Sequence, residues 1–544
     1  MNRYAFYTAV AVGLAWRIYM LTNYGLVSGG EVDVYLADEG VVGLMGKHIL
    51  EGRELPVFFY GQSYLGALEA YCAALAFALF GVSFVSLRLV TFLFSIAVGV
   101  AVYHFAYRIY SVAVARWATA LVAVAPMYFL QWNLKARGGF VEHILLVFLV
   151  MLAFWHFYIY HRRDTRTAFL LGLVSGIALW VNQLVAAYLG VMAMLVLWHR
   201  EDRRGWTPAV VGLLLGASLL IGYNIAHPLA TARSLARKAL VLNRVDVAER
   251  DQSWAQRGAA ERVRALGDGF DKLGIVFGVP PGEGVERLGM SQDSKTGGPL
   301  AGVRRALFVL PLAVFAAGLW AARPRRGPGG WAGLHSDQLL GIFAVVTFLV
   351  GYVSPRYMLP AYPIAAILAA VLAARSGGPW RRPVHAGLAA VMIFNVASWV
   401  DAASLPPAAD EDRGLALIEL IRSKGISACY SAAPMYHLVF ASNETVVLSP
   451  LQKDRYPAYS AVVEAADSIC YVFRDDQTTK RQHVAMQELL ERHHVRYQQA
   501  QVGPYRVLYD FTPRRAITAA EVEKVRHQET ARVGPGTKND TETE

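Results

Sequence analysis

The sequence is poor in charge and in cysteine. Charged residues make up 17% of the 544 residues and hydrophobic residues 55%, whereas a soluble globular protein has about 25% and about 45–50%. Three cysteines are too few for a disulfide framework or a zinc site. Cys429 and Cys470 could pair in an oxidising compartment, but each lies in an apolar, strand-like run, and we expect buried free thiols. This composition excludes a soluble enzyme, a secreted disulfide scaffold and a disordered adaptor.

Two repeating patterns are also missing. Alternation of polar and apolar residues with period two is absent, which excludes a membrane β-barrel, and no internal repeat supports an inverted-repeat transporter. Instead, long runs carry no charge, and about 20 apolar residues suffice for a helix to cross a bilayer. The uncharged runs are 89–107, 117–134, 144–160, 168–198, 207–226, 306–322, 357–374 and 384–400. They predict a polytopic α-helical membrane protein.

Positive charge gathers between these runs. The net charge is +11, but no basic stripe with interleaved aromatic residues indicates a nucleic-acid partner. The positive-inside rule places the arginine clusters on the cytoplasmic side. All clusters share that side if 168–198 forms two short spans that turn at Asn182-Gln183 and if 70–87 lies against the outer surface. The sequence then predicts about eleven spans, with the N-terminus inside and the C-terminus outside.

This topology collects the remaining polar sequence on the outer face. In the membrane module, residues 1–400, the expected outer loops are about 27–88, 131–143 and 227–305. The first helix begins at Tyr4 and lacks an obvious cleavage site, which indicates an anchor and not a removable signal peptide. We therefore expect a multi-pass protein of a bacterial cytoplasmic membrane that works on the extracytoplasmic side.

The C-terminal part changes character. Within 401–511, a helical pattern over 411–424 precedes strand-like runs, a second helix at about 480–493 and two final strands over 496–502 and 505–511. This order predicts a small extracytoplasmic α/β accessory domain. No Gly-rich loop follows its strands, so we expect no nucleotide site there. Residues 512–544 are polar and charged, which is typical of a disordered tail.

Two adjacent carboxylates, Asp38 and Glu39, precede a helix-like run in the first outer loop. Asp38 could be a helix N-cap, because a carboxylate near a helix N-terminus is stabilised by the macrodipole. Asp38 could also be a general base that takes a proton from an acceptor hydroxyl at the membrane surface. The residue types alone leave both interpretations open.

The loop around this pair, ADEGVVGLMGKHILEGRELPVFFYGQSYLGALEAY, resembles the first periplasmic loop of the GT-C superfamily. These integral-membrane glycosyltransferases include the protein O-mannosyltransferases and the lipid A aminoarabinose transferases. The matching positions are Asp38, Glu39, Gly52, Pro56, Gly61, Gln62 and Tyr64. Two later segments are similar to the family through Arg88, Arg356, Tyr357, Pro360 and Pro363. The resemblance implies an enzyme that transfers a sugar from a polyprenyl-phosphate donor to an acceptor on the outer face, normally with inversion.

The sequence departs from the family in two places. Gly66-Ala67-Leu68-Glu69 stands where the family often has Glu-Lys-Pro, whose lysine can hold the donor phosphate. Glu142 stands where the family usually has an aspartate. The resemblance therefore implies a divergent member. In it, Asp38 would be the general base and Glu39 its supporting carboxylate.

A departing lipid phosphate needs cations or N–H donors around it. Lys135, Arg137 and Arg356 are available on the expected outer side, and Gly138-Gly139 would allow close backbone approach to a ligand. Tyr357, Gln62 and Tyr64 complete the expected substrate-binding set. The alternative for each of these cations is snorkelling to lipid headgroups. Snorkelling would also explain Arg17 within the first span, for which the other explanation is a polar pocket.

Glu142 and His143 at a span entrance could orient the acceptor or hold a divalent cation. One carboxylate and one imidazole are a weak ligand set, so a structural role is favoured, and we expect no required cofactor. The expected partners are a polyprenyl-phosphate sugar donor, an unknown lipid, glycan or protein acceptor, and membrane lipids. A transporter or flippase of lipid-linked saccharides is the main alternative, but it would need ionisable groups deep within several spans. A polymerase of such saccharides would instead carry catalytic arginines in a large outer loop.

Overall fold

The structure of the chain is a computed structural model. It describes residues 1–22, 36–159, 164–198, 206–236, 272–278, 336–351, 354–404, 411–451, 454–475, 477–513 and 521. The predicted span 306–322, most of the loop 227–305 and almost all of the tail 512–544 lie outside these residues. The chain divides into two units, of which unit 1 is Met1–Glu31 with Met45–Pro407 and unit 2 is Val32–Leu44 with Ala408–Glu544.

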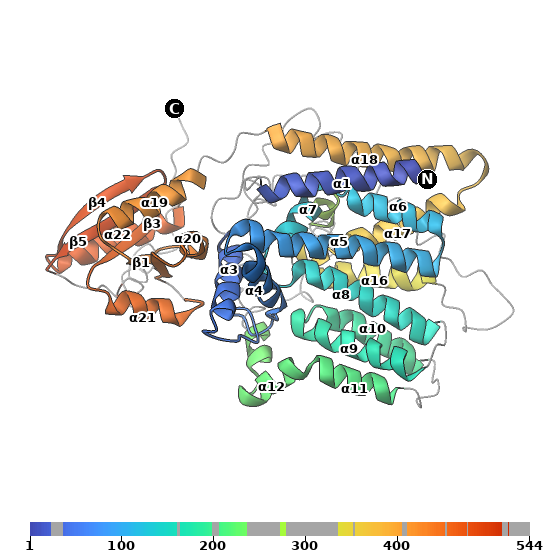
Figure 1. Ribbon diagram of the computed structural model, residues 1–544, viewed down its shortest axis with the longest axis horizontal. Coiled ribbons are helices and arrows are strands. Elements are labelled where there is room, and N and C mark those ends of the chain that lie inside the picture. The colour runs from blue at the N-terminus through green and yellow to red at the C-terminus, as the bar shows by residue number, and fades with distance from the viewer. Residues whose placement is uncertain are drawn as a thin grey trace, which may run out of the picture. The chain divides into compact units, whose positions relative to one another are not determined.

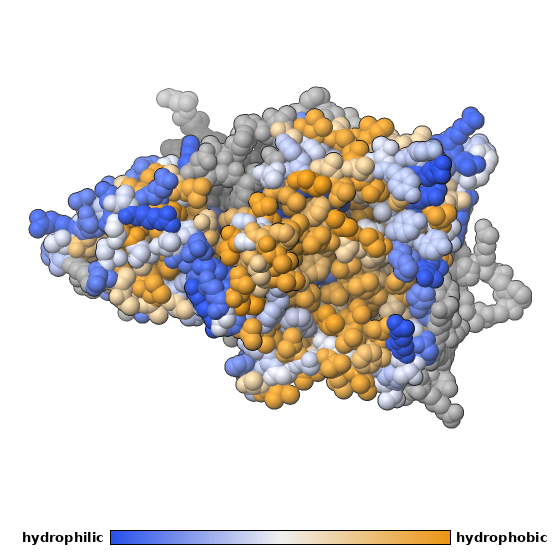
Figure 2. Space-filling model, viewed as in Figure 1, coloured by the Kyte–Doolittle hydropathy of each residue, from blue (hydrophilic) through white to orange (hydrophobic). Residues whose placement is uncertain are grey.

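Unit 1 is helical (Figure 1). Its long helices lie side by side, and Figure 2 shows an apolar surface over their middle parts. Its α-helices are α1 (Arg3–Thr22), α4 (Leu68–Phe80), α5 (Phe84–Ile109), α6 (Val112–Ala123), α7 (Met127–Leu134), α8 (Phe140–Phe154), α9 (Thr165–Val181), α10 (Val185–Trp198), α11 (Thr207–Gly216), α12 (Ser218–Ala226), α16 (Ser336–Gly351), α17 (Ala361–Arg375) and α18 (Arg381–Ser404). Shorter turns are the π-helical η1 (Trp155–Ile159) and the 3₁₀ turns η5 (Pro355–Met358) and η6 (Gly378–Trp380).

These helices make the protein a multi-pass membrane protein. Within the described ranges, four helices are long and apolar enough to cross a membrane, or six if each of two bent pairs is one span. The run 168–198 forms two helices, α9 and α10, separated by residues 182–184, as predicted. Helix α4 has 13 residues, which span about 20 Å and fall short of a bilayer core of about 30 Å.

Helices α9 and α11 approach each other through glycine. Gly172 and Gly176 on α9 face Gly212 and Gly216 on α11, and a Cβ atom added at Gly172 would lie 1.8 Å from the Ala209 carbonyl oxygen. At each glycine, the backbone of the partner helix therefore occupies the space that a side chain would need. This small-xxx-small pattern on both helices is a frequent packing mode inside membranes, where apolar side chains gain little by leaving lipid.

A sharp bend of 80° separates α6 from α7. Pro126 has no N–H to donate to the Val122 carbonyl, so the last turn of α6 leaves carbonyls without partners of their own helix. Side chains of three other helices supply the donors. Tyr362 donates to Leu121 O (2.9 Å), Arg17 to Val122 O (3.0 Å) and Ala123 O (2.6 Å), Asn395 to Val124 O (2.8 Å), and Trp399 to Ala125 O (3.0 Å). Every carbonyl from 121 to 125 thus accepts a side-chain hydrogen bond.

Unit 2 holds a five-stranded sheet, which confirms the predicted small α/β region. The strand order is β2-β1-β3-β5-β4. Strand β1 pairs in parallel with β2 and β3, and β5 pairs antiparallel with both β3 and β4. The strands are β1 (Ala428–Ser431), β2 (Val447–Pro450), β3 (Ile469–Arg474), β4 (Arg496–Val502) and β5 (Tyr505–Thr512). The helices are α19 (Glu411–Ser423), α20 (Tyr436–Ala441), α21 (Pro457–Ala465) and α22 (Gln477–Arg492).

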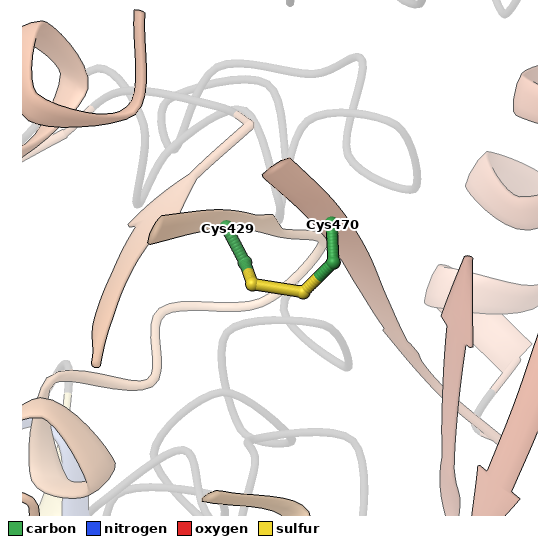
Figure 3. Close-up of a disulfide and its surroundings, with 2 residues drawn as sticks. All are labelled: Cys429 and Cys470. Carbon is green, nitrogen blue, oxygen red and sulfur yellow. A yellow bond between two sulfur atoms is a disulfide. The ribbon is translucent and has the colours of Figure 1, made fainter. Parts of the chain in front are cut away.

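The two cysteines of the sheet form a disulfide (Figure 3), so the prediction of free thiols there is wrong. Cys429 on β1 and Cys470 on β3 are register partners in adjacent parallel strands, with Cα atoms 4.5 Å apart. An apolar strand environment does not prevent pairing when the register places two side chains opposite each other. Cys72 is a free thiol.

Part of the first predicted outer loop belongs to unit 2. Helix α3 (Leu36–Leu50) contributes its residues up to Leu44 to this unit. A Cβ atom at Gly40 would lie 2.2 Å from the backbone nitrogen of His437, and one at Gly43 would lie 2.7 Å from the Phe440 ring. Two glycines one turn apart therefore let the start of α3 pack directly on α20.

Candidate functional site

Three loops of unit 1 meet at one end of its helices. They are the segment 56–66 before α4, the segment 135–139 between α7 and α8, and the turn 182–184 between α9 and α10. Gly66 N donates to Val181 O (3.0 Å) and Trp180 Nε1 donates to Val57 O (2.9 Å). Asn182 Nδ2 donates to Gly139 O (3.4 Å) and so links the third loop to the second.

The turn at Gly138-Gly139 is built around Glu69. Both glycines have positive φ angles, 75° and 91°, which glycine adopts without strain. Their N–H groups donate to Glu69 Oε2 from α4. We expected these glycines to let a ligand approach the backbone closely. Instead, the Phe59 ring occupies that space, because a Cβ atom at Gly138 would lie 2.7 Å from it.

A row of aromatic rings joins the two predicted phosphate-binding arginines. The Arg137 guanidinium lies 4.3 Å from the centre of the Trp132 ring. Trp132 contacts Phe140 (5.1 Å), and Phe140 stacks on Tyr357 (6.2 Å). The Arg356 guanidinium lies over the Tyr357 ring at 5.1 Å, and its Nη2 donates to the Tyr357 hydroxyl (3.3 Å). The structure thus brings Arg137, Arg356 and Tyr357 together in one row.

The cations of the second loop are buried. Lys135 is 5% exposed and Arg137 3%, so snorkelling to lipid headgroups does not describe either side chain. Arg17 is also buried, and its guanidinium donates to Ser95 Oγ (3.1 Å) and to the carbonyls at the end of α6. Arg17 therefore does not snorkel to lipid headgroups either. Helix α1 packs against α6, and backbone carbonyls of α6 accept hydrogen bonds from the Arg17 guanidinium.

Glu142 and His143 begin α8 in the interior of unit 1. Glu142 is fully buried, and neither of its carboxylate oxygens has a hydrogen-bond partner within the described part of the chain. Glu142 and Glu69 both lie within electrostatic range of the Cys72 thiol, which places the two carboxylates in one region. The His143 ring lies 6.2 Å from that of Tyr188.

Gln62 and Tyr64 shape the first loop. The Tyr64 hydroxyl donates to Gln62 Oε1 (2.7 Å), and Gln62 N donates to Phe59 O (2.9 Å). Upstream in the same loop, the Tyr60 hydroxyl hydrogen-bonds His48 Nδ1 (2.9 Å) and Glu54. These bonds hold Phe59 against the Gly138 turn. Gln62 and Tyr64 therefore have at least a local structural role.

Asp38 and Glu39 lie in the first turn of α3 within unit 2. Asp38 is inside the helix, two residues after its start, so it does not occupy the N-cap position. Its Oδ1 accepts from Arg455 Nη1 at 2.6 Å, and both side chains are about a quarter exposed. Glu39 is fully buried.

Arg455 is held in place by its neighbour Asp454. The Asp454 carboxylate accepts from Tyr436 OH (2.6 Å), Ser449 Oγ (2.9 Å) and Ser460 Oγ (3.0 Å). The backbone N–H of Arg455 donates to the same Tyr436 hydroxyl (2.7 Å). Burial and the Asp454 charge raise the pKa of Tyr436, so this hydroxyl stays protonated and can donate. The loop after β2 thus presents Arg455 to Asp38 in a fixed geometry.

Sequence reasoning did not identify Glu69 as the acceptor that holds the Gly138-Gly139 turn. The signal was available, because Glu69 is the only charged residue in the otherwise apolar helix α4. It also missed Trp132, since aromatic residues near span ends are common in membrane proteins. Among the residues that the structure describes, no group of three or more His, Cys, Asp or Glu side chains could hold a metal ion.

The fold and one segment of the chain resemble a known class of protein. Residues 67–226 match the family model described as dolichyl-phosphate-mannose-protein mannosyltransferase. Together with the solved structures below, this match confirms the predicted resemblance to the GT-C glycosyltransferases. No curated protein sequence matches the chain.

Individual proteins of known structure share this fold. ArnT from Cupriavidus metallidurans bound to undecaprenyl phosphate is similar over 92% of this chain and 97% of its own, with a TM-score of 0.57 and 12% identity. An oligosaccharyltransferase from Archaeoglobus fulgidus in the apo form is similar over 89% of this chain and 71% of its own, with a TM-score of 0.53 and 14% identity. At such identities the similarity establishes the fold.

Proposed function

We propose that the protein transfers a sugar from a polyprenyl-phosphate-linked donor to a nucleophile, an acceptor hydroxyl or other group, on the extracytoplasmic face, with inversion. The observation that carries the proposal is the aromatic row that has Arg137 at one end and Arg356 at the other. The similar fold of an ArnT structure that contains undecaprenyl phosphate supports a lipid-phosphate ligand.

The chemistry needs a base and a site for the leaving group. For a hydroxyl acceptor, the oxygen attacks the anomeric carbon while a carboxylate takes its proton, the bond from that carbon to the phosphate oxygen breaks, and the polyprenyl phosphate leaves with the electron pair. We assign the base to Asp38, with Glu39 supporting it. The ion pair with Arg455 supports this assignment, because it holds the Asp38 carboxylate in one orientation.

The leaving phosphate develops negative charge, which preorganised cations stabilise. Arg137 suits this task because a guanidinium can bind two phosphate oxygens at once. Its buried position beside Trp132 excludes water and strengthens the attraction. Lys135, from the same loop, adds a second positive charge. Gln62 and Tyr64 would line the approach of the substrate.

The extracytoplasmic location has support in unit 2. Disulfides persist in oxidising compartments and are rare in the cytosol. The Cys429–Cys470 disulfide therefore favours a bacterial inner-membrane protein whose C-terminal unit lies outside the cytoplasm. Fusions of a reporter that is active on only one side of the membrane, placed after residue 513, test this assignment. Activity of a cytoplasmic reporter there would contradict it.

The experiment is sugar transfer in membranes supplied with radiolabelled polyprenyl-phosphate sugars. Arg137→Gln should lower the transfer rate about 10²–10³-fold, the usual loss on removing one donor to developing charge, while Arg137→Lys should retain part of the rate. Arg166→Gln is the matched control, because Arg166 is an exposed arginine at the start of α9. Equal rates for the Arg137→Gln and Arg166→Gln variants would refute the phosphate site.

Asp38 is tested separately. Asp38→Asn should abolish transfer at equal protein level, and Asp467→Asn, which changes an exposed aspartate of the same unit, should not. Full transfer by the Asp38→Asn variant would reject Asp38 as the base and move the search to Glu39 or Glu142. Absence of transfer by the wild type with all donor sugars offered would instead contradict the proposed reaction.

A further inference from the structure

A groove runs along the outside of helices α1, α5 and α6. Its volume is about 370 Å³, and its wall is formed by apolar side chains such as Phe6, Leu14, Ile96, Val100 and Tyr103. Phe6 lies beside Tyr103 at one end, and Arg17 hydrogen-bonds Ser95 at the other. Because α1 advances about 1.5 Å per residue, these two ends are about 16 Å apart. That length fits an extended acyl chain.

The groove is open to the surrounding apolar phase. Val100 is 63% exposed in its wall. Among the residues that the structure describes, a Cβ atom added at Gly99 would meet no atom within 4 Å, so space lies directly above this residue. In water, a groove with these apolar walls would be unfavourable, because it would expose apolar side chains to solvent. In the hydrocarbon region of a membrane, lipid chains fill such a groove.

The Phe6 end of the groove opens toward positive charge. Arg3 precedes Phe6 by one turn on α1, Arg116 precedes the groove residue Thr119 by one turn on α6, and Arg108 follows Tyr103 on α5. Arg116 and Arg381 both lie within electrostatic range of the amino end of α1. Residues 1–22, 84–123 and 361–400 contain no Asp or Glu, so these helices supply no acidic partner of their own. Figure 2 shows hydrophilic surface at this end of unit 1.

We propose that this groove binds one anionic glycerophospholipid, with its phosphate among Arg3, Arg116 and Arg381 and one acyl chain between Phe6 and Ser95. Charge complementarity selects the headgroup, since each basic residue near an anionic lipid surface adds to the attraction. The acyl chain fills the groove, and each buried methylene contributes to affinity. A neutral-headed lipid would satisfy only the second requirement.

This lipid site is distinct from the proposed donor site. Helix α8 starts at the loop that holds Arg137, and α6 starts at the basic end and reaches the bend before α7. The basic end of the groove, where the headgroup is placed, therefore lies at the start of α6, and the other end reaches the last turn of α6 before the bend. A structural lipid held there would brace α1 against α5 and α6 without taking part in transfer.

The test measures retained lipid directly. The full chain is purified from nanodiscs of phosphatidylcholine with one tenth phosphatidylglycerol, and native mass spectrometry counts the lipids that stay bound after delipidation. We expect one phosphatidylglycerol per chain and a loss of at least fivefold in Gly99→Leu, which fills the groove. Gly190→Leu is the matched control, because a Cβ atom at Gly190 on α10 likewise meets no atom of the described ranges within 4 Å and Gly190 lies outside the groove.

Two further arms separate the alternatives. Arg116→Gln with Arg381→Gln should reduce retention of phosphatidylglycerol while leaving the weak binding of phosphatidylcholine unchanged. Added polyprenyl phosphate should not displace the bound lipid. Unchanged retention in Gly99→Leu, equal retention of the two phospholipids, or displacement by polyprenyl phosphate would each overturn the proposal. None of these outcomes depends on whether the protein transfers sugar.

Discussion

Arg17 stabilises the bend between α6 and α7, and its replacement by methionine isolates that contribution. Methionine has a similar length and no donor, so Arg17→Met keeps the packing volume and removes the hydrogen bonds. The carbonyls of Val122 and Ala123 then lose their partners, and Pro126 cannot replace the first of them. The 3.1 Å hydrogen bond to Ser95 is lost as well.

The size of the effect follows from these contacts. A buried acceptor left without a partner costs about 1–3 kcal/mol, so two carbonyls cost about 2–6 kcal/mol by the same estimate. Methionine avoids the desolvation of a buried charge, which offsets part of this loss. We expect Arg17→Met to lower the free energy of unfolding by about 2–4 kcal/mol, after this offset. Tyr362→Phe removes only one neutral donor, to Leu121 O, and should cost about 0.5–1.5 kcal/mol.

The assay is equilibrium unfolding in mixed detergent micelles, with Arg3→Met as the control. Arg3 is an exposed arginine of the same helix, so this control removes the same charge without touching the bend. The expected order of stability is Arg3→Met above Tyr362→Phe above Arg17→Met. If Arg17→Met were as stable as Arg3→Met, the capping explanation of the bend would be refuted.

Three further predictions concern single contacts. Removing the Cys429–Cys470 disulfide should destabilise unit 2 by about 4 kcal/mol by the loop-entropy relation, because the disulfide closes a loop with a sequence separation of 41. Cys72→Ser should leave the stability of unit 2 unchanged under oxidising conditions. Burial and the Arg506 charge lower the pKa of His483, so its protonation opposes folding, and hydrogen exchange of β3 should accelerate as the pH falls below about 6.5. His483→Leu should remove this pH dependence; an identical profile in wild type and variant would contradict it. Gly172→Leu should reduce folded yield, because its side chain would enter the α11 backbone. Gly222→Leu should fold normally, because a Cβ atom at Gly222 meets no atom within 4 Å in the part of the chain that the structure describes.

The fold class could be predicted because membrane helices are defined by length and apolar composition, which are readable in one sequence. The turn between α9 and α10 and the succession of helices and strands along unit 2 followed from short polar or apolar runs. The sharp bend after α6 could not be predicted with the same rules. Pro126 marks a possible break, but the donors that stabilise it, Tyr362, Asn395 and Trp399, come from distant helices.

The candidate site was partly predictable. Arg137 and Arg356 were identified by type and by expected loop, and the structure joins them through rings whose pairing no spacing rule gives. Glu69 was visible only as a departure from a family pattern, yet it holds the Gly138 turn. The disulfide was misjudged because pairing depends on strand register, which depends on the complete sheet.

Unit 2 is assembled from the two extremes of the chain, and this affects how the protein is made. Its first segment ends at Leu44 and its second begins at Ala408, so roughly 360 residues are synthesised between them. At about 5–20 residues per second, that interval lasts about 20–70 s. During this time the face of α3 around Gly40 and Gly43 has no α20 to pack against. Ribosome-bound chains stalled before residue 408 should therefore carry an α3 that binds chaperones or is cut by added protease, and release of full-length chains should protect it.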